Sequence, residues 1–474
     1  MYNADIAITD GTVVTMDHRR RVIENGVLLI KDNAICYVGE SNSVKWKAEQ
    51  IIDAHDSIVM PGLIDIHGHA GHGLIKSLGD HPDGQWLSVA EEIYFRNSTE
   101  QFWHAEARLS ALERLKFGVT TGYSMLGNVP RTDDPRWALS HTKGVHDVGI
   151  RDMLGIGPPL PPWPKKVQYL ETDKTKIKRF THTASLEVTE EICSMYRNGD
   201  FPEKTIVHLS PSRIGDPQGL GEELLKTQED AVVRMADDYD LLVNSHAYRG
   251  NIEYAYDNSD ILNQQIVLAH CAGITQKEIE ILAETETSVA HCPNARAIIR
   301  DWCPVTQLLD AGVNTVVASD GSGPDRSFCL FKDARTAARI HRIKEQDETL
   351  LPPGKLLEMV TVDAAQAVGL ENKIGSLETG KYADVIVVDI HNAHQYPVDM
   401  PIHRLAYVTS GADVSDVIVN GEVLMLNYQV MSVDEEDVLA SAQFEYELAL
   451  DRSGLHEEAE PPFEQLWETH RPLK

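Results

Sequence analysis

Eight short apolar runs alternate with helical patterns between residues 62 and 369, and this alternation constrains the fold more than any other feature. Strands that alternate with helices indicate a parallel sheet or barrel. The predicted strands are Leu63–His67, Val119–Ser124, Met153–Gly157, Thr205–Leu209, Leu241–Ser245, Ile266–His270, Ser288–His291 and Thr315–Ser319. Their number, and a span of about 300 residues, are typical of a (β/α)8 TIM barrel, so we predict an α/β fold of this type.

Strand-like alternation of apolar and polar residues also occurs at both ends of the chain. It runs through residues 3–60 and returns in 383–389 and 417–423, where Asn420-Gly421 is a type I′ hairpin signal. Two separated β-rich ends predict one discontinuous β-sandwich domain. The predicted division is a first sandwich part over 1–61, a metal-dependent barrel over 62–370, a second sandwich part over 371–430 and a helical extension over 431–474.

Local signals place several further segments. Residues 98–117 form a helical pattern that Gly118 closes, and Ser432-Val-Asp-Glu435 is a capping-box pattern before a C-terminal helix. The proline-rich stretch 158–164 follows the third strand and cannot continue a helix or a ladder, so we expect a loop over the barrel's catalytic face. The basic stretch Lys165–Arg179 is predicted to be a solvated loop.

Composition excludes several classes of partner. The 474 residues carry a formal net charge of -30, which argues against nucleic acid, and no apolar stretch approaches the ~20 residues that a membrane span needs. The six cysteines form no Cys-x-x-Cys pair, so we expect reduced thiols. The first residues show no basic region followed by a hydrophobic stretch, and we therefore expect a cytoplasmic protein.

Metal-type residues stand where predicted strands end. His67 and His69 end the first strand, His246 follows the fifth, His270 ends the sixth and Asp320 follows the eighth. Residues i and i+2 of a strand project to the same side, and barrel enzymes build their active sites at the C-terminal ends of the strands. Imidazoles with a carboxylate suit a divalent ion, with Zn²⁺ first and Fe²⁺, Co²⁺ or Ni²⁺ as alternatives.

Such a set of ligands leaves a position for water, whose pKa falls to near 7 on the ion, so the site would hold hydroxide at neutral pH. We predict that Asp320 accepts the proton of this water and returns it to a leaving group, while His270 orients the hydroxide and polarises the electrophile. His208 and His291, near the ends of the fourth and seventh strands, either line the pocket or form structural hydrogen bonds. Trp163 either roofs the pocket or packs in a surface loop.

Together these residues resemble the amidohydrolase superfamily, in the branch that contains the triazine hydrolases and aromatic deaminases. The resemblance spans almost the whole chain. It rests on Ile8–Met16, Met60–His69, Phe117–Thr121, Leu268–His270, Ser319–Gly321 and Ile374–Asp384. It implies that His67, His69, His246 and Asp320 bind the metal and that His270 is the catalytic histidine of strand six.

The resemblance also bears on the number of metal ions. Two-metal members supply a lysine or a glutamate from strand four, whereas Thr205-Ile-Val-His-Leu-Ser-Pro211 has neither at its end. We therefore expect one divalent ion per chain.

One departure from the branch concerns the substrate. Its deaminases and triazine hydrolases usually place a glutamate three residues after the strand-five histidine, where it protonates a ring nitrogen, and this chain has Arg249 there. A guanidinium cannot perform that acid step, but it can hold a substrate carbonyl or carboxylate. Glu253, four residues further on, is the alternative acid.

The main prediction is therefore hydrolysis of a non-peptide carbonyl C–N or C–S bond in an amide, urea, carbamate or thiocarbamate, similar to the phenylurea and molinate hydrolases of the branch. Two alternatives stay open. One is an aminohydrolase or dechlorinase of a nitrogen heterocycle such as a triazine or purine, and the other is a scaffold without catalysis, against which the retained ligands argue. The expected partner is a small molecule, and the resemblance implies a homo-oligomer.

Overall fold

The computed structural model describes residues 1–79, 85–127, 131–171, 174–295, 302–460 and 467. Its centre is an eight-stranded parallel sheet with the order β15-β14-β13-β12-β11-β8-β7-β6. The strands are β6 Leu63–Asp65, β7 Val119–Met125, β8 Arg151–Ile156, β11 Thr205–Leu209, β12 Val243–Tyr248, β13 Ile266–Ala272, β14 Ser288–His291 and β15 Thr315–Val317. All eight predicted strands are present, and the predicted barrel is confirmed.

The first and last strands of this sheet approach each other and nearly close the barrel. The Asp320 amide donates to the His67 carbonyl at 3.0 Å. Ser319 donates its backbone N–H at 3.0 Å and its hydroxyl at 2.6 Å to the two carboxylate oxygens of Asp65. Because these links lie at the ends of β6 and β15, they bring the residues that follow the two strands to one place.

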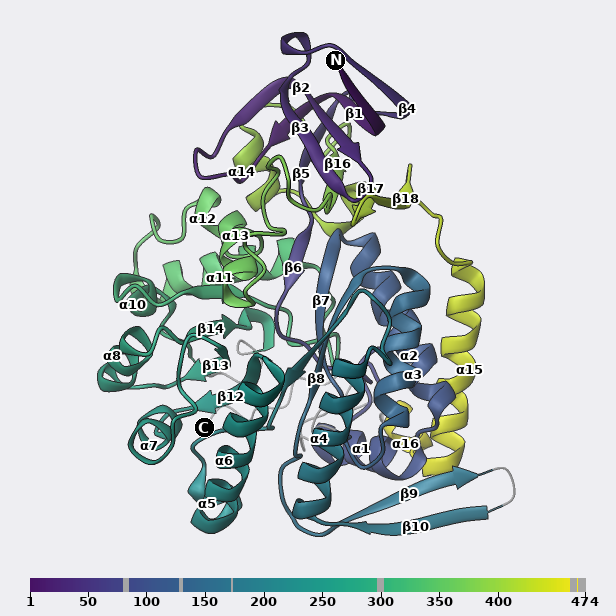
Figure 1. Ribbon diagram of the computed structural model, residues 1–474, viewed down its shortest axis with the longest axis vertical. Helices are drawn as coiled ribbons and strands as arrows, with labels where there is room; N and C mark the ends of the chain where they lie inside the picture. The colour runs from purple at the N-terminus through teal and green to yellow at the C-terminus, as the bar shows by residue number, and fades with distance from the viewer. Residues whose placement is uncertain (80–84, 128–130, 172–173, 296–301, 461–466, 468–474) are drawn as a thin grey trace.

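Helices surround the barrel strands (Figure 1). The helices before residue 300 are α1 Trp86–Glu92, η2 Ile93–Asn97, α2 Glu100–Lys116, α3 Arg136–Val148, α4 His182–Asn198, α5 Pro217–Leu220, α6 Glu222–Tyr239, α7 Asn251–Asn258 and α8 Gln276–Glu284. The later ones are α10 Val305–Asp310, α11 Leu330–Glu345, α12 Pro353–Glu358, α13 Val362–Ala367, α14 Pro401–Tyr407, α15 Glu435–Ser453 and α16 His456–Ala459. A large apolar cluster packs helices against strands, and a smaller one that includes Ile64, Met153 and Val316 fills the barrel interior.

The two ends of the chain share one nine-stranded mixed sheet above the barrel, which confirms the predicted discontinuous β domain (Figure 1). Its order is β19-β18-β17-β16-β5-β1-β2-β3, with β4 paired to β1. The strands are β1 Tyr2–Val14, β2 Val22–Lys31, β3 Ala34–Glu40, β4 Trp46–Asp53, β5 Ser57–Pro61, β16 Val385–Asp389, β17 Val414–Val419, β18 Glu422–Leu426 and β19 Gln429–Val430. Asn420 and Gly421 have φ values of 53° and 81°, as the predicted hairpin turn between β17 and β18 requires.

Two local predictions were wrong. The basic stretch is a β-hairpin, β9 Lys165–Glu171 and β10 Lys174–Phe180, because Val167, Tyr169 and Phe180 alternate with polar residues and turn inward. The cap of α15 is Asp434, whose carboxylate accepts from the Glu436 and Asp437 amides, and it is not Ser432.

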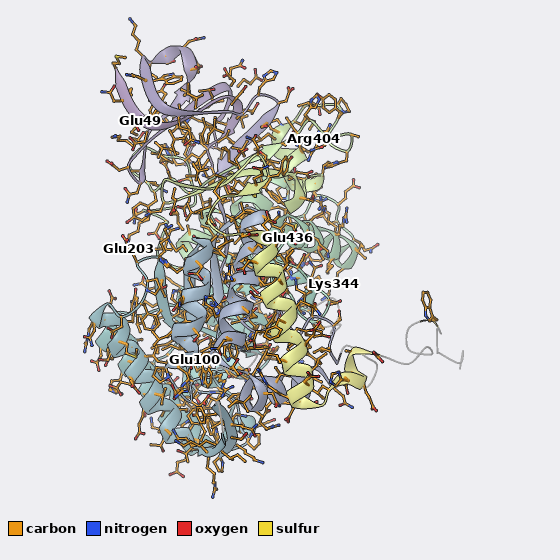
Figure 2. All side chains as sticks on the ribbon, turned by 90° about the vertical axis from the view of Figure 1, so that its right-hand side faces the viewer. Glu49, Glu100, Glu203, Lys344, Arg404 and Glu436 are labelled. Carbon is orange, nitrogen blue, oxygen red and sulfur yellow. The ribbon has the colours of Figure 1, made fainter. Side chains whose placement is uncertain are left out.

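The C-terminal helix α15 lies along α2 on the outside of the barrel (Figure 2). Ion pairs fix its first turn, since Lys116 contacts Glu435 at 2.6 Å and Arg108 contacts Asp437 at 2.8 Å. Among the described residues, no helix is long and apolar enough to cross a membrane.

Candidate metal centre

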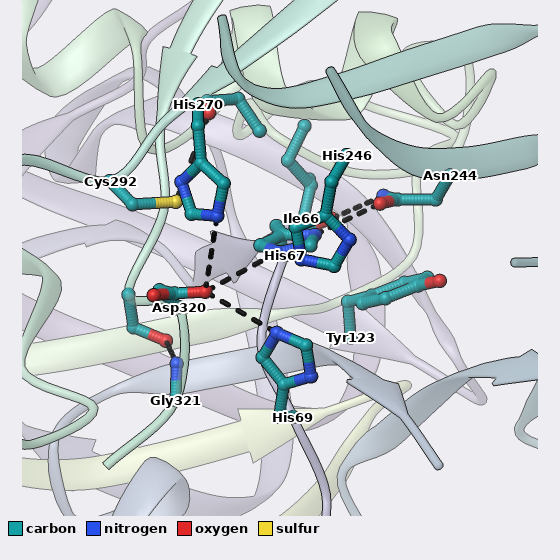
Figure 3. Close-up of polar contacts among 12 residues, drawn as sticks. Ile66, His67, His69, Tyr123, Asn244, His246, His270, Cys292, Asp320 and Gly321 are labelled. Carbon is teal, nitrogen blue, oxygen red and sulfur yellow. Dashed lines mark hydrogen bonds and ion pairs between the residues drawn. The ribbon is translucent and has the colours of Figure 1, made fainter. Parts of the chain in front are cut away.

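Four predicted ligands meet at the C-terminal ends of the barrel strands. His67 and His69 follow β6, His246 lies in β12 and Asp320 follows β15, and one ligand atom from each lies within 4.8 Å of the others (Figure 3). The Nε2 atoms of His67 and His69 both lie 3.4 Å from Asp320 Oδ1. Residues that are separated by more than 250 positions thus form one compact set of ligands.

Hydrogen bonds at the far side of each ring fix which nitrogen faces the centre. His67 Nδ1 contacts Asn244 Oδ1 at 2.9 Å, His69 Nδ1 contacts the Gly127 carbonyl at 2.8 Å, and His246 Nδ1 contacts the Ser212 carbonyl at 2.8 Å. An oxygen acceptor holds the proton on Nδ1, so Nε2 presents a lone pair to the centre. This is the arrangement of a metal-binding imidazole.

The environment of the imidazoles also favours metal binding. Burial, followed by the neighbouring His67 and His69, holds the pKa of His246 well below its ordinary value, so its ring is neutral. Apart from its contact with Asp320, the buried Nε2 of His67 has no hydrogen-bond partner within the described ranges. The neutral imidazole of His246, the orphaned buried nitrogen of His67 and a carboxylate fit a divalent ion of the zinc type.

Asn244 connects the His67 ligand to the interior of the barrel. Its side-chain amide donates to the Ile66 carbonyl at 2.8 Å, so its oxygen is oriented to accept from His67. The Ser210 hydroxyl donates to the Asn244 carbonyl at 2.6 Å and contacts the Tyr123 hydroxyl at 2.7 Å. The Tyr123 ring in turn stacks on His67 at 5.9 Å between ring centroids, and the imidazole is therefore held at both its edge and its face.

Asp320 presents its two carboxylate oxygens to different partners. Oδ1 faces the histidines, whereas Oδ2 lies 3.5 Å from the Arg326 guanidinium. Burial raises the pKa of this carboxyl, but the neighbouring His270 and Arg326 outweigh burial and hold it well below its ordinary value. Asp320 is therefore ionised, and its φ of 64° is a strained conformation of the kind that functional sites retain.

His270 completes the centre from β13. Its Nε2 lies 3.8 Å from Asp320 Oδ1, and its φ of 73° is likewise in the left-handed region. His270, Cys292 and Asp320 form a second close group of potential ligand atoms (Figure 3). The His270 ring stacks on Tyr248 with 5.7 Å between the ring centroids. The predicted catalytic pair is thus adjacent to the predicted ligands.

Three predicted pocket residues have other contacts. His208 is buried near the Tyr123 ring, and burial lowers its pKa to about 4. His291 contacts the ring of His341 on α11 at 5.3 Å, and Trp163 packs on Phe180 and His182. The packing of Trp163 favours the surface-loop interpretation, and a contact of any of the three with substrate stays a prediction.

Arg249 follows β12 and its side chain is exposed. It lines a pocket of about 540 Å³ together with Arg213, Tyr248 and Tyr254. Glu253, the alternative acid, lies on α7 and forms a 2.6 Å ion pair with Lys277 at the surface. The ion pair gives Glu253 a structural partner away from the metal ligands.

Four site residues, Asn244, Tyr123, Arg326 and Cys292, were not predicted from the sequence. Asn244 had a detectable signal, because it precedes His246 by two residues and so lies on the same face of β12. Cys292 is the direct neighbour of the predicted His291, and only the position of the strand shows which of the two faces the centre. Tyr123 and Arg326 carried no signal of this kind.

Comparisons with known proteins identify the family of the chain. The model of the Amidohydrolase family matches residues 58–424. A 5'-deoxyadenosine deaminase of Methanosarcina acetivorans is 31% identical over 93% of this chain and 97% of its own. A 5-methylthioadenosine/S-adenosylhomocysteine deaminase of Moorella thermoacetica is 30% identical over 92% and 97%.

Solved structures show the same fold at lower identity. An adenosine deaminase of Xanthomonas campestris with bound zinc superimposes with a TM-score of 0.81 at 21% identity, covering 95% of this chain and 99% of its own. An atrazine chlorohydrolase of Arthrobacter aurescens TC1 complexed with zinc gives 0.78 at 23%, covering 93% and 100%. The family match and the relatives at 30% identity or above confirm the prediction of a metal-dependent hydrolase, and the chain belongs to the amidohydrolase family.

Proposed function

We propose that this protein is an aminohydrolase that removes an exocyclic amino group from a nitrogen heterocycle of the adenine type. The observation that carries the proposal is the similarity to deaminases of adenine nucleosides at 30–31% identity over more than nine-tenths of the chain. It favours the heterocycle alternative that the sequence left open over the main prediction of an amide, urea, carbamate or thiocarbamate. None of the relatives compared above is a phenylurea or molinate hydrolase.

His67, His69, His246 and Asp320 would hold one ion, for which we propose zinc. When bound, the ion would lower the pKa of a coordinated water and so supply the nucleophile at neutral pH. The chain's own groups handle the protons: ionised Asp320 accepts one, and its contact with Arg326 keeps Oδ1 turned toward the centre. His270, 3.8 Å from Asp320 Oδ1, orients the group under attack.

A second candidate is favoured by Arg249. The exposed guanidinium cannot protonate a ring nitrogen, so the aminohydrolase proposal requires another acid. Hydrolysis at the carbonyl group of a urea, amide, carbamate or thiocarbamate needs no ring protonation. The presence of Arg249 at this position therefore favours that hydrolysis as the alternative activity.

The two candidates differ in their products. The test is turnover of matched panels by the zinc-reconstituted protein: adenine nucleosides and aminotriazines in one panel, N-aryl ureas, thiocarbamates and aryl amides in the other, with products identified by mass. We expect ammonia and the hydroxylated heterocycle. Cleavage confined to the second panel would reject the aminohydrolase proposal and select the second candidate.

The assigned roles have a separate test. Asp320→Asn should lower kcat roughly 10²–10⁴-fold, because the amide cannot accept the proton. Removal of the metal with a chelator should abolish turnover, and one equivalent of zinc should restore it. Metal content of the variant, measured by mass spectrometry, separates loss of the base from loss of the ion, and an active metal-free protein would contradict the assignment.

A further inference from the structure

We propose that the pocket between the loops after β11 and β12 binds a carboxylate group carried by the substrate. The inference rests on the proposed function, since it takes the reacting end of that substrate to lie at the metal centre. The lining residues are Arg213, Gly215, Asp216, Pro217, Gln218, Tyr248, Arg249, Gly250, Asn251 and Tyr254, around a volume of about 540 Å³. A volume of this size holds a substituent of a small molecule.

The pocket adjoins the metal centre on the side of His246. Arg213 directly follows Ser212, whose carbonyl is the hydrogen-bond partner of His246 Nδ1. Tyr248 stacks on His270, and the Arg213 guanidinium lies 4.9 Å from the centroid of the same tyrosine ring. One aromatic ring therefore contacts a residue of the centre and a residue of the pocket, and the pocket lies next to the centre.

The charged residues of the pocket favour binding of a ligand that carries a single negative charge. The Arg213 guanidinium is paired with Asp216 at 2.8 Å. Arg249 forms no ion pair with any residue that the structure describes. One uncompensated positive charge thus faces the pocket, in a chain whose net charge is -30.

The chemistry of these side chains selects the kind of anion. A guanidinium presents parallel N–H donors that match the two oxygens of a carboxylate. The rings of Tyr248 and Tyr254 add flat apolar walls next to it. A monoanionic carboxylate on a planar group fits this combination better than a phosphate dianion, for which only one free charge is available.

Binding of benzoate tests the subsite without reference to turnover. We expect calorimetry to show benzoate binding to the protein both with and without zinc, and binding at least roughly tenfold tighter than that of the neutral isostere benzamide. Arg249→Met should weaken benzoate binding by a similar factor and leave the affinity for benzamide unchanged. Arg179→Met removes an exposed guanidinium that does not line the pocket and should change neither affinity.

Three results would overturn the proposal: equal affinity of wild type and Arg249→Met for benzoate, benzoate binding only when zinc is present, or inorganic phosphate binding more tightly than benzoate.

A kinetic experiment compares turnover of an amino heterocycle that carries a carboxylate with turnover of the corresponding primary amide. We expect Arg249→Met to raise KM for the acid and not for the primary amide. If benzoate binds as predicted but no heterocycle is deaminated, the proposed function is rejected and the carboxylate subsite is retained. If a heterocycle is deaminated but wild type and Arg249→Met bind benzoate equally well, the subsite is rejected and the proposed function is retained.

Discussion

At the residue scale, the metal centre depends on how each imidazole is held by a hydrogen-bond acceptor behind it. Two of the three acceptors are backbone carbonyls, of Gly127 and Ser212, which no side-chain substitution can remove. The third is the side chain of Asn244, fully buried between His67 and the Ile66 carbonyl. Asn244 is therefore the position at which the outer support of the metal centre can be tested.

We predict that Asn244→Ala lowers the affinity for zinc by about 10–100-fold, because His67 loses the acceptor that fixes its tautomer and orientation. Competition with a chromogenic chelator measures this affinity independently of activity. The exposed Asn372→Ala is the matched control and should bind zinc as the wild type does. An unchanged affinity in Asn244→Ala would show that ring stacking with Tyr123 alone orients His67.

At the scale of single elements, the start of α15 shows that the N-cap of a helix can lie two residues from the position that the sequence pattern predicts. Ser432 and Asp434 are both good capping residues, and the structure uses Asp434, whose Oδ1 accepts from the Glu436 and Asp437 amides at 3.0 and 3.4 Å. The helix start is then tied to α2 through Lys116 and Glu435. Packing against α2 decides where the first turn can begin.

Asp434→Ala should destabilise the first turn of α15 by about 1 kcal/mol, the usual contribution of an N-cap. Hydrogen exchange of the amides of residues 436–438 measures this local stability. Ser432→Ala serves as the comparison and should leave those amides unchanged. Faster exchange in the Ser432 variant alone would contradict the assigned cap.

At the scale of the whole molecule, buried neutral histidines link stability to pH. Burial, with a smaller effect of Lys344, lowers the pKa of His341 to about 4 from an ordinary value of 6.5. Between these two values the unfolded chain binds a proton that the folded chain does not, so unfolding becomes easier as the pH falls from 6.5 toward 4. Above pH 6.5 the group has no such effect.

For His341→Gln we therefore expect a smaller loss of unfolding free energy between pH 7 and pH 5 than for the wild type, by about 2 kcal/mol. Urea unfolding at the two pH values gives the difference. His55→Gln, at an exposed position, should keep the wild-type pH dependence. Identical pH dependence in His341→Gln and the wild type would mean that folding does not lower the pKa of this histidine.

The order of residues along the chain is enough to predict the architecture and the types of residue in the centre. Eight apolar runs alternating with helices are enough to predict a barrel, since each strand must bury both faces, and the strand ends identify His67, His69, His246, His270 and Asp320. Motif spacing also led to the family, because the same residues recur at the same strand ends.

The folded chain is needed to show which neighbouring side chains face the centre and which residues support them. A period of two predicts that His291 and Cys292 point to opposite sides but not which of them points inward, and contacts place Cys292 with His270 and Asp320. Arg249 and Arg213 come from different loops, and loop conformation has no period that a sequence could reveal. Hydrogen bonds and charges between distant segments depend on packing, which exists only once the chain has folded.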